Sequence, residues 1–357
     1  MHKIAVIGYG MMGQRHAAAL RALGYQVDVL MGRDAERTKE AAGKLGIKKS
    51  CTDFNCLAEM GIDVVHVCTP PSEHFSVIKQ ALESGMHVVS EKPFVFSEDE
   101  GKALVELAKA QNVINAVGFN CRYHEACSDA RNIVRNGMLG DVLLVNGSYM
   151  QEFHALPASF SWRYGKESGG KFLATTEIGS HWIDLMRYIT GKEVVALQAV
   201  YGTFMQDRVV ADGMQWPAGQ KTGTPFRFEA DNAAIVTFSL SGGALASMVL
   251  SEITQGRYNY LEMTVTGSDG SLWWNSEDLN RLKTGRKGID VSEKVYAFGD
   301  GFNDSVTNML SEVYEDIESG KRNPAHRYAT FSDGLKNAQI CDAIYRSAHG
   351  NSAWVSL

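Results

Sequence analysis

The chain contains 357 residues, which is long for one ordinary domain and suits two, and 45% of its residues are hydrophobic, as in other globular proteins. Its formal net charge of -6 excludes the global positive field that attracts nucleic acids and anionic membranes, so we expect neither as a partner. An apolar strand begins almost at once, and no apolar run approaches the roughly 20 residues of a membrane span, so we expect a cytoplasmic protein.

The first part of the chain, residues 1–120, alternates short apolar runs with segments of helical periodicity. Strands are expected at 3–8, 27–31, 62–68, 87–90 and 115–119. Helices are expected at 14–23, 35–45, 73–84 and 98–110. This βαβα order predicts an α/β domain with a parallel sheet and helices on both faces.

A glycine-rich turn joins the first expected strand to the first helix. Residues 8–13 read G-Y-G-M-M-G, the G-x-G-x-x-G pattern of a dinucleotide-binding turn in its proper strand–turn–helix context. Gly8 permits the tight turn, Gly10 lets the backbone approach a pyrophosphate, and Gly13 lets the helix pack close to the sheet. Because the first N–H groups of a helix and its dipole favour phosphates, the pattern predicts a Rossmann domain that binds a dinucleotide.

The end of the second strand bears on the choice between NAD and NADP. An acidic residue there usually binds the ribose hydroxyls of NAD, whereas an arginine accommodates the 2′-phosphate of NADP. This chain has Gly32 at the usual acidic position, followed by Arg33 and Asp34. Arg33 suits a 2′-phosphate or the adenine ring and Asp34 suits a ribose, so we expect NAD and keep NADP as the alternative.

Beyond residue 120 the rhythm changes. Helices are expected at 125–136, 180–189, 305–319 and 332–349, with an aromatic loop at 151–170. Strands are expected at 142–150, 194–201, 232–239, 244–251, 260–267 and 271–275. Runs of strands with few helices predict an α+β domain with a mostly antiparallel sheet. We therefore expect a Rossmann domain at 1–120 and a second domain at 121–357.

The cysteines are scattered and contain no C-x-x-C pair. Such spacing is typical of reduced thiols, so we expect neither a disulfide framework nor a metal site. The six positions are Cys51, Cys56, Cys68, Cys121, Cys127 and Cys341.

Several motifs together resemble the Gfo/Idh/MocA oxidoreductase family, named for glucose–fructose oxidoreductase and inositol dehydrogenase. Besides the glycine turn they are T-P-P-S-E-H at 69–74, S-E-K-P at 90–93, G-F-N-C-R-Y at 118–123, E-I-G-S-H at 177–181 and G-S-D-G-S-L at 267–272. The resemblance covers essentially the whole chain. It implies hydride transfer between a sugar or polyol carbon and a nicotinamide cofactor. It also implies a second, substrate-binding domain whose large open sheet often forms an oligomer interface, so we expect a homodimer or homotetramer.

The resemblance assigns catalytic roles to three residues. By position, Lys92 hydrogen-bonds the reacting hydroxyl and His181 is the general acid/base. Glu177 stands where family members usually carry an aspartate, and its extra methylene leaves its contact with substrate or His181 open. The residue types suit the chemistry, since oxidation of an alcohol needs a base at the oxygen and histidine titrates near neutrality. The resemblance also implies a cis peptide bond between Lys92 and Pro93.

Further residues are candidate ligands, and no metal site is expected. The expected cofactor-binding residues are Gly8, Tyr9, Gly10, Met11, Met12, Gly13, Arg33, Asp34, Thr69, Pro70, His74, Glu91 and Lys92. The expected substrate-binding residues are Asn120, Arg122, Tyr123, His154, Trp162, Arg163 and Lys171. Aromatic faces with polar donors suit a sugar ring, and an arginine suits an anionic substituent.

Three functions fit these patterns. The leading one is an NAD(P)-dependent sugar dehydrogenase or reductase. The alternative is an NAD-dependent glycoside hydrolase, similar to sulfoquinovosidases, that oxidises the sugar transiently, eliminates the aglycone, adds water and reduces the product. His154, Arg163 and Lys171 would suit an anionic glycoside of that kind. The remote alternative is a non-enzymatic regulator that binds NAD(P).

Overall fold

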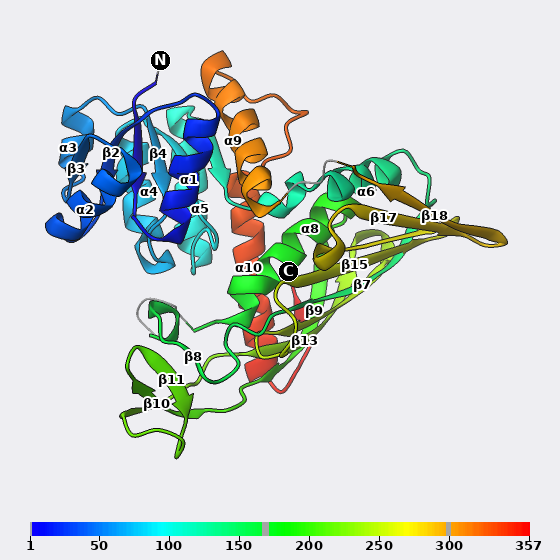
Figure 1. Cartoon of the computed structure of the whole chain (residues 1–357). Helices are drawn as coiled ribbons and strands as arrows, with labels where there is room; N and C mark the ends of the chain where they lie inside the picture. The colour runs from blue at the N-terminus through cyan, green and yellow to red at the C-terminus, as the bar shows by residue number, and fades with distance from the viewer. Residues whose placement is uncertain (1, 166–170, 298–300) are drawn as a thin grey trace. The chain divides into compact units, whose positions relative to one another are not determined.

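The computed structural model describes residues 2–165, 171–297 and 301–357. The chain divides into two compact units: the first comprises Met1–Tyr123 and Asp300–Ala338, and the second comprises His124–Gly299 and Gln339–Leu357 (Figure 1). Residues 300–338, which were expected in the second domain, thus belong to the first compact unit. Apolar side chains of that segment explain this assignment, because Val313 and Tyr314 are buried in the core of the Rossmann sheet.

The described part of the first unit contains a parallel sheet of six strands in the order β3-β2-β1-β4-β5-β6. Its strands are β1 (Ile4–Ile7), β2 (Val27–Met31), β3 (Lys49–Cys51), β4 (Val64–Val67), β5 (His87–Ser90) and β6 (Asn115–Val117). Every residue of β1 and β4 is buried, as expected for strands covered on both faces. The strand order reverses between β1 and β4, and open α/β sheets bind ligands at the carboxyl ends of strands at such a point.

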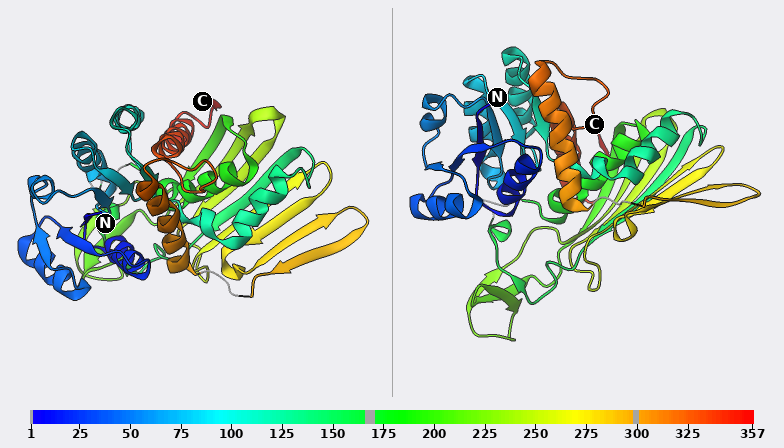
Figure 2. Two further views of the ribbon diagram at one scale, coloured as in Figure 1. Left: turned by 90° about the horizontal axis from the view of Figure 1, so that it is seen from above. Right: turned by 45° about the horizontal axis from the view of Figure 1, so that its top comes forward.

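Helices cover both faces of this sheet (Figure 2). One face packs against α1 (Met11–Ala22), α2 (Ala35–Leu45) and α9 (Phe302–Ser319). The other packs against α3 (Asn55–Glu59), α4 (His74–Glu83) and α5 (Glu98–Gln111). Short 3₁₀ turns, η1 (Pro71–Glu73) and η2 (Asn120–Tyr123), follow β4 and β6. The expected Rossmann fold is confirmed.

The second unit is built on a large, mostly antiparallel sheet, which in the described residues has the strand order β18-β17-β16-β15-β7-β14-β13-β9-β19. These strands are β7 (Val142–Met150), β9 (Val194–Gly202), β13 (Ala233–Leu240), β14 (Leu245–Ser251), β15 (Tyr260–Gly267), β16 (Ser271–Asn275), β17 (Arg281–Arg286), β18 (Ile289–Val295) and β19 (Val355–Ser356). Burial alternates along β13 and β14, because helices cover one face of the sheet only. This architecture confirms the expected fold class.

The covered face packs against α6 (Glu125–Arg135) and α8 (Ser180–Thr190), and α10 (Phe331–His349) supplies the closing helix of the chain. Trp182 of α8 is fully buried; its indole N–H donates to the carbonyl oxygen of Glu262 at 3.0 Å, and its ring stacks on Phe238 of β13. A second, small sheet has the order β12-β10-β11-β8. Its strands are β8 (Ala158–Ser159), β10 (Asp207–Ala211), β11 (Met214–Pro217) and β12 (Thr224–Arg227).

Several elements were not predicted from the sequence. They include β3, α3, the β17–β18 hairpin, β19 and the whole small sheet. Most of them are short. β18 is longer and contains the apolar residues Ile289, Val291 and Val295, but every residue of it is exposed, so burial in a core does not define it.

The structure corrects the expectation for two cysteines, which form a disulfide between Cys51 and Cys56. Cys51 ends β3 and Cys56 lies in α3, and the connection between these elements brings their Cα atoms to 7.0 Å. Within the residues that the structure describes, no helix combines the length and the apolar character needed to cross a lipid bilayer.

Candidate active site

The glycine turn after β1 has the geometry that its sequence predicts. Gly8 has a φ of +103°, and a side chain there would meet the carbonyl oxygen of Cys68 at 2.5 Å. A Cβ on Gly13 would lie 1.9 Å from the carbonyl oxygen of Gly8, so helix α1 packs against the turn at a distance that only glycine permits. Gly10 differs from both, since apart from its chain neighbours and the backbone of its own helix no atom of the described residues lies within 4 Å of the position of its Cβ.

Helix α1 begins at this open glycine. Gly10 is its N-cap, makes no side-chain cap bond, and the first turn contains no acidic residue. The N–H groups of a first helical turn need acceptors, and the helix dipole favours a negative one. The turn therefore fits the pyrophosphate of a dinucleotide.

Tyr9 explains why glycine replaces the usual acid after β2. A Cβ on Gly32 would lie 2.5 Å from the ring of Tyr9 and 2.5 Å from Oγ1 of Thr38. The tyrosine ring thus occupies the space of a side chain at this position.

Arg33 and Asp34 differ sharply in how they are held. The carboxylate of Asp34 is the N-cap of α2 and accepts from the N–H of Arg37 at 2.9 Å. The side chain of Arg33 is 80% exposed, and its guanidinium lies 3.1 Å from a carboxylate oxygen of Glu73. Both residues lie just after β2, where a Rossmann domain places the adenosine ribose of a dinucleotide.

The segment after β4 also offers polar groups. The Oγ1 atom of Thr69 is buried and has no hydrogen-bond partner in the described part of the chain. His74 is fully buried, and its two ring nitrogens lie 3.0 Å from the carbonyl oxygen of Thr69 and 2.9 Å from that of Pro93. Burial lowers the pKa of His74. His74 therefore ties the end of β4 to the segment that carries Lys92, and Thr69 keeps a donor available for a ligand.

Lys92 lies directly after β5, at the carboxyl edge of the sheet, and is only partly buried. The peptide bond between Lys92 and Pro93 is cis. The preceding side chain, Glu91, points inward: it is 7% exposed, and its carboxylate contacts His16 at 3.0 Å. The first unit thus combines an open helix N-terminus with a lysine at the same sheet edge.

In the second unit, Glu177 and His181 flank the junction of two helical segments. Glu177 lies in a π-helical stretch, η4 (Thr175–Gly179), and His181 lies in the first turn of α8. The imidazole of His181 is 9% exposed, and its ring centroid lies 6.3 Å from that of Tyr149. Single π-helical turns often occur at functional sites.

Asp231 holds the start of this segment and was not predicted from the sequence. Its carboxylate accepts from the N–H groups of Leu173 and Thr175, each at 2.7 Å, and from the hydroxyl of Thr175 at 2.6 Å. It comes from a loop almost sixty residues further along the chain, so no local pattern indicates the contact.

Three candidate substrate-binding cations each have a carboxylate partner within the second unit. Arg163 contacts Glu177 at 2.9 Å, and Lys171 contacts Asp342 at 2.9 Å. The imidazole of His154 contacts a carboxylate oxygen of Glu252, whose side chain is 1% exposed. Trp162 is placed in the turn η3 (Trp162–Tyr164), but its side chain lies outside the described residues, as do Gly169 and Gly170.

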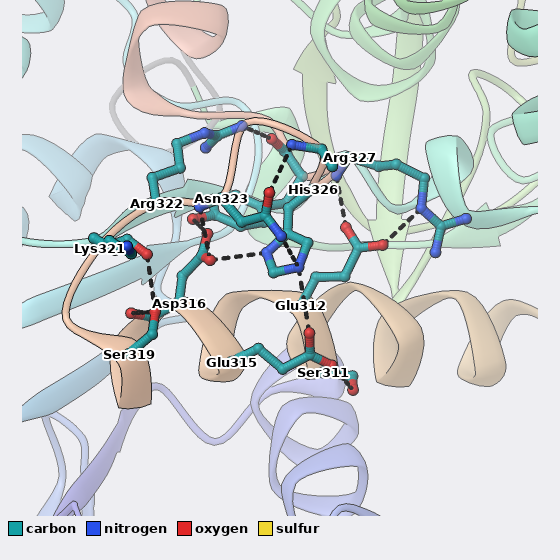
Figure 3. A network of polar contacts seen from close by, with 12 residues as sticks. Ser311, Glu312, Glu315, Asp316, Ser319, Lys321, Arg322, Asn323, His326 and Arg327 are labelled. Carbon is teal, nitrogen blue, oxygen red and sulfur yellow. Dashed lines mark hydrogen bonds and ion pairs between the residues drawn. The ribbon is translucent and has the colours of Figure 1, made fainter.

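The residues after β6 have structural contacts in the first unit. Tyr123 is 1% exposed and donates to Glu312 at 2.5 Å. Glu312 also accepts from the side chain of Arg327 at 2.8 Å, as Figure 3 shows. Arg122 donates to the carbonyl oxygen of Arg327 at 3.0 Å, and the amide of Asn120 donates to Ser305 at 2.6 Å. These contacts anchor the segment to α9 and to the loop that follows it, so we infer a structural role for Tyr123.

Comparison with known proteins decides the family. Residues 2–119 match the model of an oxidoreductase family with an NAD-binding Rossmann fold, and residues 127–273 match the model of the GFO/IDH/MocA C-terminal domain. The chain belongs to the Gfo/Idh/MocA family.

Relatives within the Gfo/Idh/MocA family include sugar and polyol dehydrogenases. Levoglucosan dehydrogenase from Pseudarthrobacter phenanthrenivorans is 28% identical, and the match covers 99% of this chain and 97% of that protein. Myo-inositol 2-dehydrogenase from Thermotoga maritima is 27% identical, with 89% of each chain covered. A solved structure of levoglucosan dehydrogenase in complex with NADH and L-sorbose superposes with a TM-score of 0.91 at 26% identity, covering 100% of this chain and 98% of that one.

Membership of the Gfo/Idh/MocA family confirms two expectations from the sequence: the chain is of an oxidoreductase family, and its first domain is an NAD-binding Rossmann fold. Short motifs in the sequence indicate the family. No local pattern indicates the carboxylate contacts of Arg163 and Lys171, whose partners lie 14 and 171 positions further along the chain.

Proposed function

We propose that this protein is an NAD-dependent dehydrogenase that oxidises one hydroxyl group of a neutral sugar or polyol to a ketone. The observation that carries the proposal is the open helix N-terminus at Gly10 on the same sheet edge as Lys92. The relatives named as levoglucosan and inositol dehydrogenases support the substrate class.

The proposed catalytic roles follow the chemistry of alcohol oxidation. When bound, the nicotinamide would accept a hydride from the carbon of the substrate. The ammonium group of Lys92 hydrogen-bonds the reacting oxygen and stabilises its developing negative charge. The imidazole of His181 takes the hydroxyl proton as general base.

Charge pairing supports a neutral substrate. An anionic substituent would need an arginine, lysine or histidine whose charge is not already balanced. Arg163, Lys171 and His154 are each paired with a carboxylate. These pairs remove the reason for expecting an anionic glycoside, and the Arg163–Glu177 pair instead offers both donors and acceptors to sugar hydroxyls.

The proposal is tested by following NADH formation with levoglucosan, myo-inositol, scyllo-inositol and L-sorbose, with NAD+ and NADP+ in parallel. We expect oxidation of at least one of these compounds with NAD+. Lys92→Met and His181→Asn should each lower kcat by about 10²-fold or more, the usual scale for loss of a group that handles the proton. Lys102→Met, on the exposed surface of α5, is the matched control and should retain kcat.

Two results would contradict the proposal. One is an unchanged kcat in both active-site variants. The other is release of nitrophenol from an aryl glycoside without net NADH, which would identify a redox-neutral hydrolase.

A further inference from the structure

Four buried polar side chains form a continuous chain through the first unit. Nε2 of His16 contacts Oε1 of Glu91 at 3.0 Å, and Nδ1 of His16 contacts Nδ1 of His66 at 2.9 Å. Nε2 of His66 then contacts the hydroxyl of Tyr314 at 2.9 Å. His16, His66 and Tyr314 are fully buried, and Glu91 is 7% exposed. Glu91 was expected to bind the dinucleotide, and that role does not explain why its carboxylate points inward to His16.

The chain joins four elements that are distant in the sequence. His16 lies on α1, the helix that begins at the glycine turn, and His66 lies on β4. Glu91 follows β5 and directly precedes Lys92, and Tyr314 lies on α9. The contacts therefore connect α1, which begins at the glycine turn, to Glu91, the residue before Lys92.

The proton positions along the chain are mutually consistent. A contact between two imidazole nitrogens needs one N–H and one lone pair. Burial acts to lower the pKa of His16, but Cys68 and Glu91 raise it to about 10, whereas burial and the nearby His16 lower the pKa of His66 well below its ordinary value. A charged His16 thus donates to Glu91 and to a neutral His66, and His66 donates to Tyr314. Every nitrogen of the chain then has a partner of the right kind.

Glu91 is held at both carboxylate oxygens. Oε1 contacts His16, and Oε2 accepts from the backbone N–H of Lys92 at 3.3 Å. Gly118 leaves room for this carboxylate, because a Cβ at that position would lie 2.6 Å from Oε1. The carboxylate is therefore confined between the imidazole, the lysine backbone and a bare glycine.

We propose that His16 and Glu91 form a positioning pair that fixes the backbone of Lys92 relative to helix α1 and so sets the place of the lysine side chain. His66 and Tyr314 orient the imidazole of His16 from the opposite side. Without His16, the buried carboxylate of Glu91 loses its cationic partner, and it must take up a proton or move away from the Lys92 backbone. This inference rests on the proposed role of Lys92 in the dehydrogenase reaction.

The first test compares His16→Gln, Glu91→Gln and Gly118→Ala with the wild-type enzyme, using NAD+ and whichever compound of the sugar panel is oxidised. Each variant should lower kcat by about 10- to 100-fold, the usual scale for a residue that orients a catalytic group, while the Kd for NADH changes by less than about 3-fold. Gly118→Ala matters because it displaces the carboxylate and removes no polar group. The matched control is His87→Gln, at the other end of β5, which should retain kcat.

A double-mutant cycle with Lys92 separates positioning from general damage to the fold. In a Lys92→Met background, His16→Gln should have no further effect on the residual kcat, because the pair acts through the lysine. If His16→Gln lowers kcat equally in both backgrounds, or if the three variants retain the wild-type kcat, the positioning proposal is wrong.

A spectroscopic test does not depend on activity. In 15N-histidine NMR spectra near neutral pH, His16 should show two protonated ring nitrogens and His66 one, and Glu91→Gln should lower the pKa at which His16 loses its second ring proton. A neutral His16 in the wild-type protein would overturn the pair. Failure of the wild-type enzyme to oxidise any sugar with either cofactor would instead overturn the proposed function, and the spectra would still report on the pair.

Discussion

His124 is a buried histidine that makes the stability of the second unit depend on pH. It is 6% exposed, its Nδ1 has no hydrogen-bond partner in the described ranges, and its ring centroid lies 5.7 Å from that of Trp274. Burial lowers the pKa of His124 from 6.5 to about 4. Between these values the unfolded chain binds a proton that the folded chain does not, so stability is complete above pH 6.5 and falls as the pH drops toward 4.

We expect His124→Phe to remove this part of the acid sensitivity. Relative to wild type, the variant should gain about 3 kcal/mol of unfolding free energy between neutral pH and the lower pKa, since each pKa unit corresponds to about 1.4 kcal/mol. Urea unfolding at several pH values measures the difference. A difference in unfolding free energy between the two proteins that is the same at every pH would contradict the assignment. The difference at neutral pH serves as the control, because it reports the effect of the substitution on packing alone.

Arg33 provides a test of cofactor choice at a single residue. Because its guanidinium is exposed and paired with Glu73, we expect Arg33→Ala to change the KM for NAD+ by less than about 3-fold and to reduce use of NADP+ further. Initial rates with both cofactors measure this. The opposite result would be a wild-type enzyme that prefers NADP+ and a large rise of the KM for NADP+ in Arg33→Ala. That result would show that Arg33 binds a 2′-phosphate.

At the scale of the element, the strand–turn–helix at β1 and α1 assigns different tasks to glycines only three residues apart. The space beside Gly13 is filled by backbone, whereas the space beside Gly10 is open. Gly13 therefore serves the packing of α1 against the turn, whereas Gly10 leaves a ligand free to approach the N-terminus of the helix.

Two alanine substitutions separate these tasks. Gly13→Ala should destabilise the protein by about 1–3 kcal/mol, because its Cβ meets a carbonyl oxygen at 1.9 Å. Gly10→Ala should keep the wild-type stability but weaken NADH binding at least about tenfold. Thermal unfolding and calorimetric titration measure the two effects. Loss of stability in Gly10→Ala, or unchanged NADH binding by it, would argue against the turn as a pyrophosphate site.

At the scale of the whole molecule, the uncovered face of the large sheet suits a second copy of the chain. Val200, Ile235 and Val249 are directly paired neighbours on β9, β13 and β14, with 54%, 60% and 37% exposure. Leu245 and Leu144 form a further exposed pair on β14 and β7. Contiguous exposed apolar side chains of this kind are typical of interfaces, so we propose a homo-oligomer formed through this face.

Ile235→Glu should therefore dissociate the oligomer, because it places a charge at the centre of the apolar row. Light scattering gives the mass of the wild type and the variant. Met138→Glu, a similar change at an exposed methionine outside the sheet face, should leave the mass unchanged. A monomeric wild-type protein would refute the proposal.

Features that consecutive residues encode can be predicted from the sequence, and features that depend on distant residues cannot. Five of the six described Rossmann strands, all except β3, were predictable, as were the glycine turn and the position of Lys92, because each is encoded by neighbouring residues of one element. The small sheet and the β17–β18 hairpin were not, because their strands are short, polar or exposed. The disulfide between Cys51 and Cys56 was missed because spacing alone does not report the approach of two sulfur atoms.

The amino-acid sequence by itself determined the two-domain α/β and α+β architecture, the dinucleotide-binding turn and the membership of the family, since hydrophobic periodicity and short motifs are properties of consecutive residues. Only the tertiary structure decided which polar groups face one another: Arg163 with Glu177, Lys171 with Asp342, and the chain from Glu91 to Tyr314. His66 and Tyr314, for instance, are 248 positions apart. Their contact depends on the packing of a late helix against an early strand, which no local pattern encodes.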